Sequence, residues 1–175
     1  FYEGRYVIGQ IAAKMSKKGT AGYIASFPIP EVVMGINSFL LGAQSINPDF
    51  KMKVVWVNTW HDPAKESDAA KSLIDQGVDI LTQHTDSPAP LQIAQERGIF
   101  AFGQAENMLE FAPKATLTSI VDNWGPYYVK RVGELLAGTW KSTDTWDGIK
   151  QGTVEMAPYT NLPDDVVAMA KATAD

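Results

Sequence analysis

The stretch YIASFPIPEVVMGINSF, residues 23–39, joins a strand-like run to a helix-like run. Pro30 suits the first turn of a helix, and the apolar residues after it recur at helical spacing on one face. Phe27 lies between the two runs, in a loop that Pro28 and Pro30 make stiff. We therefore expect the flat ring of Phe27 to stack on a planar ligand. The alternative, that it packs over the start of its own helix, stays open.

The same alternation of strand-like and helix-like runs continues along the chain. Strands connected through helices form βαβ units, so the sequence predicts an α/β fold with a parallel sheet covered on both faces. The run Val54-Val55-Trp56 suggests a strand that is buried on both faces. Asp62 and Pro63 predict a helix start, and Gly77 its end. We expect strands at residues 20–26, 51–57, 78–84, 99–104 and 115–124, and helices at residues 6–15, 30–46, 63–76, 91–98, 126–138 and 162–174.

Ligands of open parallel sheets bind beyond the carboxyl ends of the strands. The segments that follow the predicted strands are SFPIPE (26–31), NTWHDP (58–63), HTDSPAP (84–90) and GQAEN (103–107). We expect them to gather along one edge of the sheet, called the rim below.

Composition excludes several kinds of partner. The net charge is −5 over 175 residues, with no basic stripe, which argues against nucleic acid. No apolar run approaches the ~20 residues that span a membrane. The absence of cysteine excludes disulfides and thiol chemistry. Because the chain starts at Phe1 without Met, we expect the true N-terminus, with any targeting segment, to be missing.

Signals of catalysis are weak. The chain has no G-x-S-x-G motif, no G-x-G-x-x-G motif and no P-loop. Its two histidines, His61 and His84, are most simply polar loop residues, and with Asp62 they make too small a set for a metal. We therefore expect a protein that is not an enzyme and has no catalytic residue, metal or cofactor.

The rim instead carries aromatic rings and small polar groups, the combination that binds a planar heteroaromatic ligand. Each aromatic residue taken alone could equally serve in packing. The candidate ligand-binding residues are Phe27, Trp60, Thr85, Asp86, Gly103, Gln104, Asp122 and Trp124.

Three motifs resemble the basic-membrane-protein (PnrA-like) family, the substrate-binding proteins of ABC importers, which include purine and nucleoside binders. They are EGRYVIG (3–9), DPAKE (62–66) and TSIVDNWG (118–125), and the resemblance covers nearly the whole chain. It implies a type I periplasmic-binding fold, in which two α/β lobes are joined by a three-stranded hinge and the ligand lies between them.

Members of this family are considerably longer than this chain. The resemblance implies that residues 3–116 form the second lobe and that residues 117–140 cross to the first lobe as a strand and a helix. Residues 141–175 then return and end in a helix. Most of the first lobe is expected to be absent, so the helix at 126–138 would expose its apolar face.

The resemblance also suggests a ligand. Phe27 falls where the family places an aromatic or apolar contact, and Gly103 falls on a strand-end glycine. Ala105 replaces the Asp that usually holds ribose, and Asp122 stands where Lys is frequent. These differences favour a free purine base such as adenine, with Asp122 accepting from an exocyclic amine or a ring N–H.

The implied role is capture of a purine base or nucleoside and delivery to a membrane permease. The implied location is the periplasm, or a lipid anchor on the outer face of the bacterial inner membrane. A binding protein for another small solute such as a sugar, and the effector domain of a regulator, remain as alternatives.

Overall fold

The computed structural model describes residues 1–175. Its sheet has six strands in the order β2-β1-β3-β4-β5-β6, and all neighbouring strands are parallel except β6, which pairs antiparallel with β5. The strands are β1 Thr20–Ala25, β2 Lys51–Trp56, β3 Ile80–His84, β4 Phe100–Ala105, β5 Thr116–Asp122 and β6 Val154–Met156. The predicted α/β fold with a mostly parallel sheet is confirmed.

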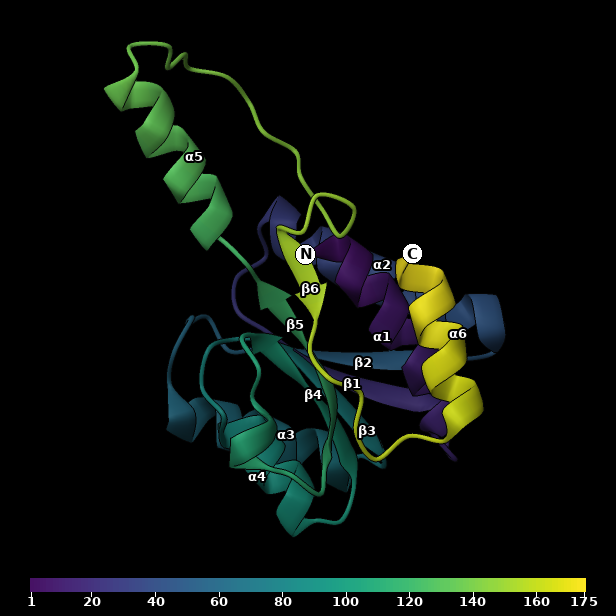
Figure 1. Ribbon diagram of the computed structural model, residues 1–175. Helices are drawn as coiled ribbons and strands as arrows, with labels where there is room; N and C mark the ends of the chain where they lie inside the picture. Colours follow the sequence, from purple (N-terminus) through teal and green to yellow (C-terminus); the bar gives the residue numbers. More distant parts are fainter.

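Helices cover both faces of the sheet (Figure 1). One face packs against α1 Tyr2–Met15, α2 Pro30–Ile46 and α6 Asp164–Ala174, around a core that includes Ile8, Phe39 and Phe102. The other face packs against α3 Pro63–Asp75 and α4 Ala89–Glu96, and the short 3₁₀ helix Leu109–Phe111 lies beside this second core.

The local signals for helix ends are confirmed. Asp62 caps α3 by accepting a hydrogen bond from the backbone N–H of Lys65 at 3.1 Å, and Pro63 and Pro30 occupy the first turns of their helices. Gly77 follows α3 with a φ of 95°, which favours glycine. The helix predicted at residues 6–15 starts earlier, at Tyr2, because the apolar pattern misses its first turn, where Gly4 is buried.

The prediction that the strand with the run Val54-Val55-Trp56 is buried on both faces is wrong. Strand β2 is one of the two edge strands of the sheet and pairs only with β1. Val54 and Val55 are only partly buried, and Trp56 is exposed. A run of apolar residues occurs in edge strands as well as in central ones. The run alone therefore does not reveal where the strand lies in the sheet.

Helices α1 and α2 touch through their backbones. A Cβ on Gly9 would collide with the carbonyl oxygen of Phe39, and a Cβ on Gly42 would collide with that of Tyr6. Only glycine allows this approach, so α1 and α2 form one rigid unit above the sheet.

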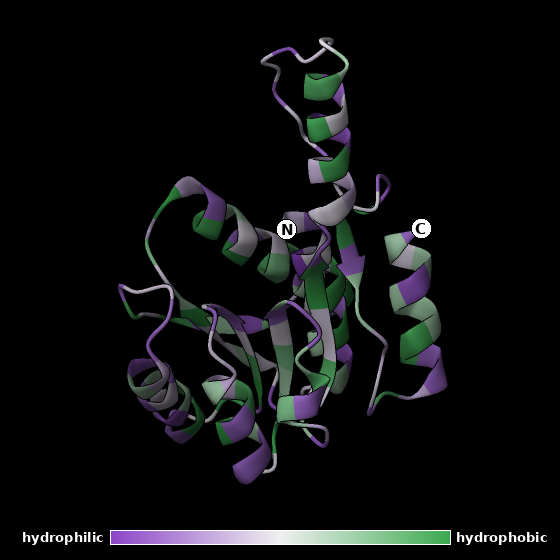
Figure 2. Cartoon of the chain, turned by 60° about the vertical axis from the view of Figure 1, so that its left-hand side comes forward, coloured by the Kyte–Doolittle hydropathy of each residue, from purple (hydrophilic) through white to green (hydrophobic).

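Helix α5, Gly125–Leu136, extends away from the sheet and has no buried residue (Figure 1). Hydrophobic residues alternate with hydrophilic ones along the projecting helix in Figure 2, and Val129, Leu135 and Leu136 are all more than half exposed. Beside it, the ring of Trp140 packs under the Arg131 guanidinium, whose central carbon lies 5.2 Å from the ring centre. No helix of the chain is long and apolar enough to cross a membrane.

Candidate functional site

Three rim loops bring their rings together. The ring of Phe27, after β1, lies 5.5 Å from that of Trp60, after β2, and the Trp60 ring lies 5.9 Å from that of His84, the last residue of β3. The Phe1 ring lies 5.6 Å beyond His84. We call these four residues the aromatic row. The side chain of Phe27 thus contacts Trp60 and remains partly exposed.

A buried arginine lies on the same side of the sheet. Arg5 of α1 is 0% exposed, and its Nη1 donates to Thr82 Oγ1 at 3.0 Å while its Nη2 donates to Gln104 Oε1. Its guanidinium lies 5.3 Å from the centre of the Tyr23 ring. No carboxylate forms an ion pair with Arg5 within the chain, which is rare for a buried charge. Burial accordingly lowers the pKa of Arg5.

His84 is neutral in this setting. Burial, together with the nearby charge of Arg5, lowers the pKa of His84 to about 3. Its Nε2 lies 3.9 Å from Oε1 of Glu31 on α2, and its Nδ1 has no hydrogen-bond partner. The ring therefore offers one donor and one acceptor, without a positive charge.

Asp122 ends β5 at the rim and is partly buried. Burial raises the pKa of Asp122 to about 6, although the charge of Arg5 acts in the opposite direction. Asp122 is therefore mostly ionised at neutral pH and can accept hydrogen bonds, while its protonation falls close to the physiological range.

Six buried side-chain polar atoms of the chain have no hydrogen-bond partner. Buried polar groups are nearly always paired, so these atoms indicate partners supplied by water or by a ligand. All six belong to α1, to β1 and β3, or to the residue directly after one of those strands. They are Arg5 Nε, Tyr23 Oη, Ser26 Oγ, Gln83 Oε1, His84 Nδ1 and Thr85 Oγ1.

The other residues predicted from the sequence lie in different settings. Thr85 is buried, whereas Asp86 is exposed and its N–H donates to the Trp60 carbonyl oxygen at 2.8 Å. Gly103 packs against β5, because a Cβ there would collide with Ser119 Oγ. Trp124 lies apart from the aromatic row and packs against two tyrosines of α5. Its ring centre lies 6.0 Å from that of Tyr127 and 6.1 Å from that of Tyr128.

Sequence reasoning missed Arg5. The signal was present in the helical spacing, because Arg5 lies on the same buried face of α1 as Ile8 and Ala12. A charged residue within an apolar stripe requires buried partners. Those partners come from β3 and β4, far away in the sequence, so they could not be identified in advance.

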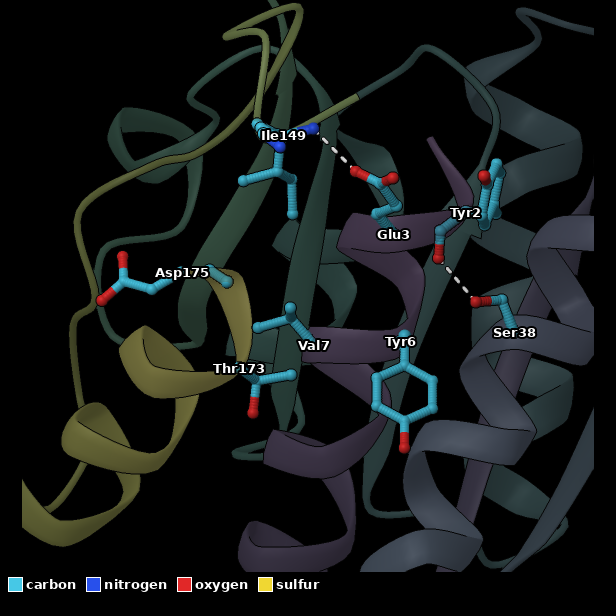
Figure 3. A pocket seen from close by; sticks show the side chains of 10 residues that line it. Tyr2, Glu3, Tyr6, Val7, Ser38, Ile149, Thr173 and Asp175 are labelled. Carbon is cyan, nitrogen blue, oxygen red and sulfur yellow. Dashed lines mark hydrogen bonds between the residues drawn. The ribbon is translucent and has the colours of Figure 1, made fainter. Parts of the chain in front are cut away.

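A pocket of about 540 Å³ opens elsewhere, between α1, α6 and the loop at Ile149 (Figure 3). Glu3 there accepts a hydrogen bond from the Ile149 N–H at 2.6 Å, and Ser38 Oγ donates to the Tyr2 carbonyl oxygen at 2.5 Å. None of the residues predicted from the sequence lines this pocket, and none of the unpartnered buried atoms belongs to it. The rim is therefore the better candidate site.

Comparison with known proteins gives one family. The sequence profile of the ABC transporter substrate-binding protein PnrA-like family matches residues 1–172. A purine-binding protein of Brucella abortus is 67% identical over 173 residues, which are 99% of this chain and 49% of that protein. TsgA13 of Haloferax volcanii, named for glucose binding in an ABC transporter, is 37% identical over 175 residues, covering 99% of this chain and 45% of that protein. The chain thus spans about half the length of these relatives.

Solved structures show the same fold. A transcriptional activator of the comK gene from Bacillus halodurans superposes with a TM-score of 0.85 at 24% identity, covering 99% of this chain and 61% of that one. An ABC transporter solute-binding protein from Aeropyrum pernix superposes with a TM-score of 0.80 at 20% identity, covering 90% of this chain and 48% of that one. The fold is that of the periplasmic binding proteins, and the chain belongs to the PnrA-like family of ABC transporter substrate-binding proteins.

Proposed function

We propose that the chain supplies one lobe of a binding protein that captures a purine base, of the adenine type, for an ABC importer. One observation carries this proposal, namely the 67% identity, over nearly the whole chain, to a purine-binding protein of Brucella abortus. Such identity usually preserves the side chains of a binding site, although the ligand itself depends on those side chains rather than on the fold.

The chemistry of the rim fits a flat, polar ligand. A purine needs aromatic faces for stacking and a few fixed donors and acceptors along its edge. Phe27 and Trp60 supply partly exposed rings, while Gln104 and Asp122 supply an amide and a carboxylate. In the proposed complex Asp122 accepts a hydrogen bond from an exocyclic amine or a ring N–H. Thr85, Asp86, Gly103 and Trp124 remain candidates with weaker geometric support.

We further propose that residues 3–116 form one lobe, that residues 117–140 cross to a second lobe, and that residues 141–175 return. The exposed apolar face of α5 supports the crossing, because a second lobe would cover it. The pairing of β6 with β5 and the packing of α6 on α1 support the return. The ligand would lie between the lobes, and closure would present it to the permease on the outer face of the membrane.

Two measurements on the two-lobe protein test the proposal. Mass spectrometry under native conditions should find a purine in protein as purified, and calorimetry should show tight binding of adenine. A ligand present at a hundredfold excess over its Kd stabilises the folded state by about 2.7 kcal/mol, so adenine should raise the Tm clearly and ribose should not.

A sugar is the second candidate ligand, because TsgA13 is named for glucose binding. Sugar sites also use stacked aromatic rings, so the aromatic row does not separate the two ligands. Binding of glucose without binding of adenine would overturn the purine assignment and leave the family assignment intact.

A further inference from the structure

The bond between Arg5 and Gln104 has a fixed polarity. A guanidinium has only donors, so the group that Arg5 Nη2 meets on Gln104 must be the carbonyl oxygen Oε1. The amide group is planar, and with Oε1 held by Arg5 its nitrogen Nε2 must face the opposite way. Arg5 therefore decides which end of the Gln104 amide is presented at the rim.

The nitrogen of this amide is free to meet a ligand. Gln104 is only 2% exposed, but its Nε2 donates no hydrogen bond within the chain and is not among the fully buried atoms without a partner, so this nitrogen keeps a slight contact with solvent. Ala105, directly after Gln104, has a φ of 64°, which turns the chain sharply at the end of β4.

Arg5 itself cannot move aside. Its Nη1 is bonded to Thr82, its guanidinium lies over the Tyr23 ring, and it is completely buried on a helix locked to α2 by Gly9 and Gly42. A glutamate at position 104 would pair with this arginine more strongly, but it would have no donor to offer. Glutamine is the residue that satisfies Arg5 and still presents an N–H.

We propose that Arg5 is a positioning residue that fixes Gln104 as a hydrogen-bond donor to the ligand. The site then selects planar bases that present an unprotonated ring nitrogen or a carbonyl oxygen to Gln104 Nε2. The inference rests on the proposed purine function, and it adds the element of specificity that an amide able to rotate would lack.

Calorimetry with adenine and with 1-, 3- and 7-deazaadenine tests the inference. Each analogue replaces one ring nitrogen by C–H, and the analogue that removes the acceptor leaves a buried donor unpaired. For the wild-type two-lobe protein, that analogue should bind roughly five- to a hundredfold more weakly than adenine. In Gln104→Glu the ratio of the two dissociation constants should fall to about one or below, since the donor is gone.

Arg5→Met is the decisive variant. It removes every donor and keeps an unbranched, apolar side chain that is shorter than arginine, so the Gln104 amide can rotate and the discrimination should shrink to within about twofold. Thr82→Val is the matched control, because it removes the other acceptor of Arg5 and leaves the hydrogen bond from Arg5 to the Gln104 amide oxygen intact. It should keep the wild-type ratio even if its Tm falls.

The outcomes separate the two proposals. If adenine does not bind the wild-type protein, the proposed purine function is wrong and the inference falls with it. If adenine binds and no analogue is discriminated, or if Arg5→Met keeps the wild-type ratio, the inference is wrong and the function stands. If Arg5 served only the stability of the fold, Arg5→Met would weaken the binding of adenine and of the three analogues by the same factor. Should Arg5→Met fail to fold, the ratio of dissociation constants can be compared between Gln104→Glu and Thr82→Val. A ratio lost only in Gln104→Glu still shows that Gln104 Nε2 donates to the ligand.

Discussion

Phe27 and Trp60 follow different strands, yet their rings meet at the rim with centroids 5.5 Å apart and planes inclined at 56°. Neither ring is fully buried, since Phe27 is intermediate and Trp60 is 39% exposed. Two tilted rings in contact hold each other in place while leaving part of their faces available to a third ring.

Replacing Phe27 with alanine should therefore weaken the binding of adenine. Stacking of a base on an aromatic side chain contributes roughly 1–3 kcal/mol, so Phe27→Ala should raise the Kd about ten- to a hundredfold in calorimetry. Phe27→Leu should recover only part of this, because it restores apolar area without a flat face. A fall in the Tm of the ligand-free protein with an unchanged Kd would show that Phe27 serves packing alone.

Trp60 and Trp124 are competing reporters of ligand binding. Trp60 belongs to the aromatic row, whereas Trp124 packs against Tyr127 and Tyr128 of α5. We expect Trp60→Phe to remove most of the ligand-induced change in tryptophan fluorescence of the two-lobe protein, and Trp124→Phe to leave most of it. The reverse result would place Trp124, at the crossing to the second lobe, closer to the ligand.

Asp122 should make stability depend on pH in an unusual direction. Burial raises the pKa of Asp122 to about 6, from roughly 3.9 in an unfolded chain. Between about pH 4 and pH 6 the folded state then binds more protons than the unfolded state, so the contribution of Asp122 to stability falls as pH rises. Because Asp122 keeps partial contact with solvent, the change should be on the order of 1 kcal/mol.

The matched comparison is with Asp122→Asn, which cannot titrate. The lowered pKa of His84 gives the opposite slope over the same range, so the wild-type curve alone is ambiguous. The difference between the unfolding free energies of Asp122→Asn and the wild type should grow from pH 4 to pH 6 and then level off. A difference that does not vary with pH would mean that Asp122 titrates normally.

Two glycines in helices should respond oppositely to alanine. Gly42→Ala places a methyl group against the backbone of Tyr6 in α1, and overpacking of this kind costs about 1–3 kcal/mol or more. Gly133→Ala lies in α5, where nothing in residues 1–175 stands within 4 Å, so in this chain it should be neutral or should stabilise the helix by up to about 1 kcal/mol. Urea unfolding of both variants measures the contrast, and equal effects would contradict the backbone contact between α1 and α2.

Sequence signals predicted what depends on near neighbours. Asp62 with Pro63 starts α3, Pro30 starts α2, and the alternation of runs gives the α/β class, because capping and periodicity act over a few residues. The order of the strands and the bond between Arg5 and Gln104 depend on contacts across the sheet. The exposure of β2 and the partners of Arg5 were therefore not readable from local pattern.

Only Asn123 and Trp124 separate Asp122, at the end of β5, from Gly125, at the start of α5. Asn123 is held to the β6 segment through both its backbone and its side chain, since its N–H donates to the Thr153 carbonyl oxygen and its Nδ2 donates to Glu155 Oε1, each at 2.8 Å. A substitution of Asp122 that suits a new ligand must therefore also preserve the direction in which α5 projects from the sheet.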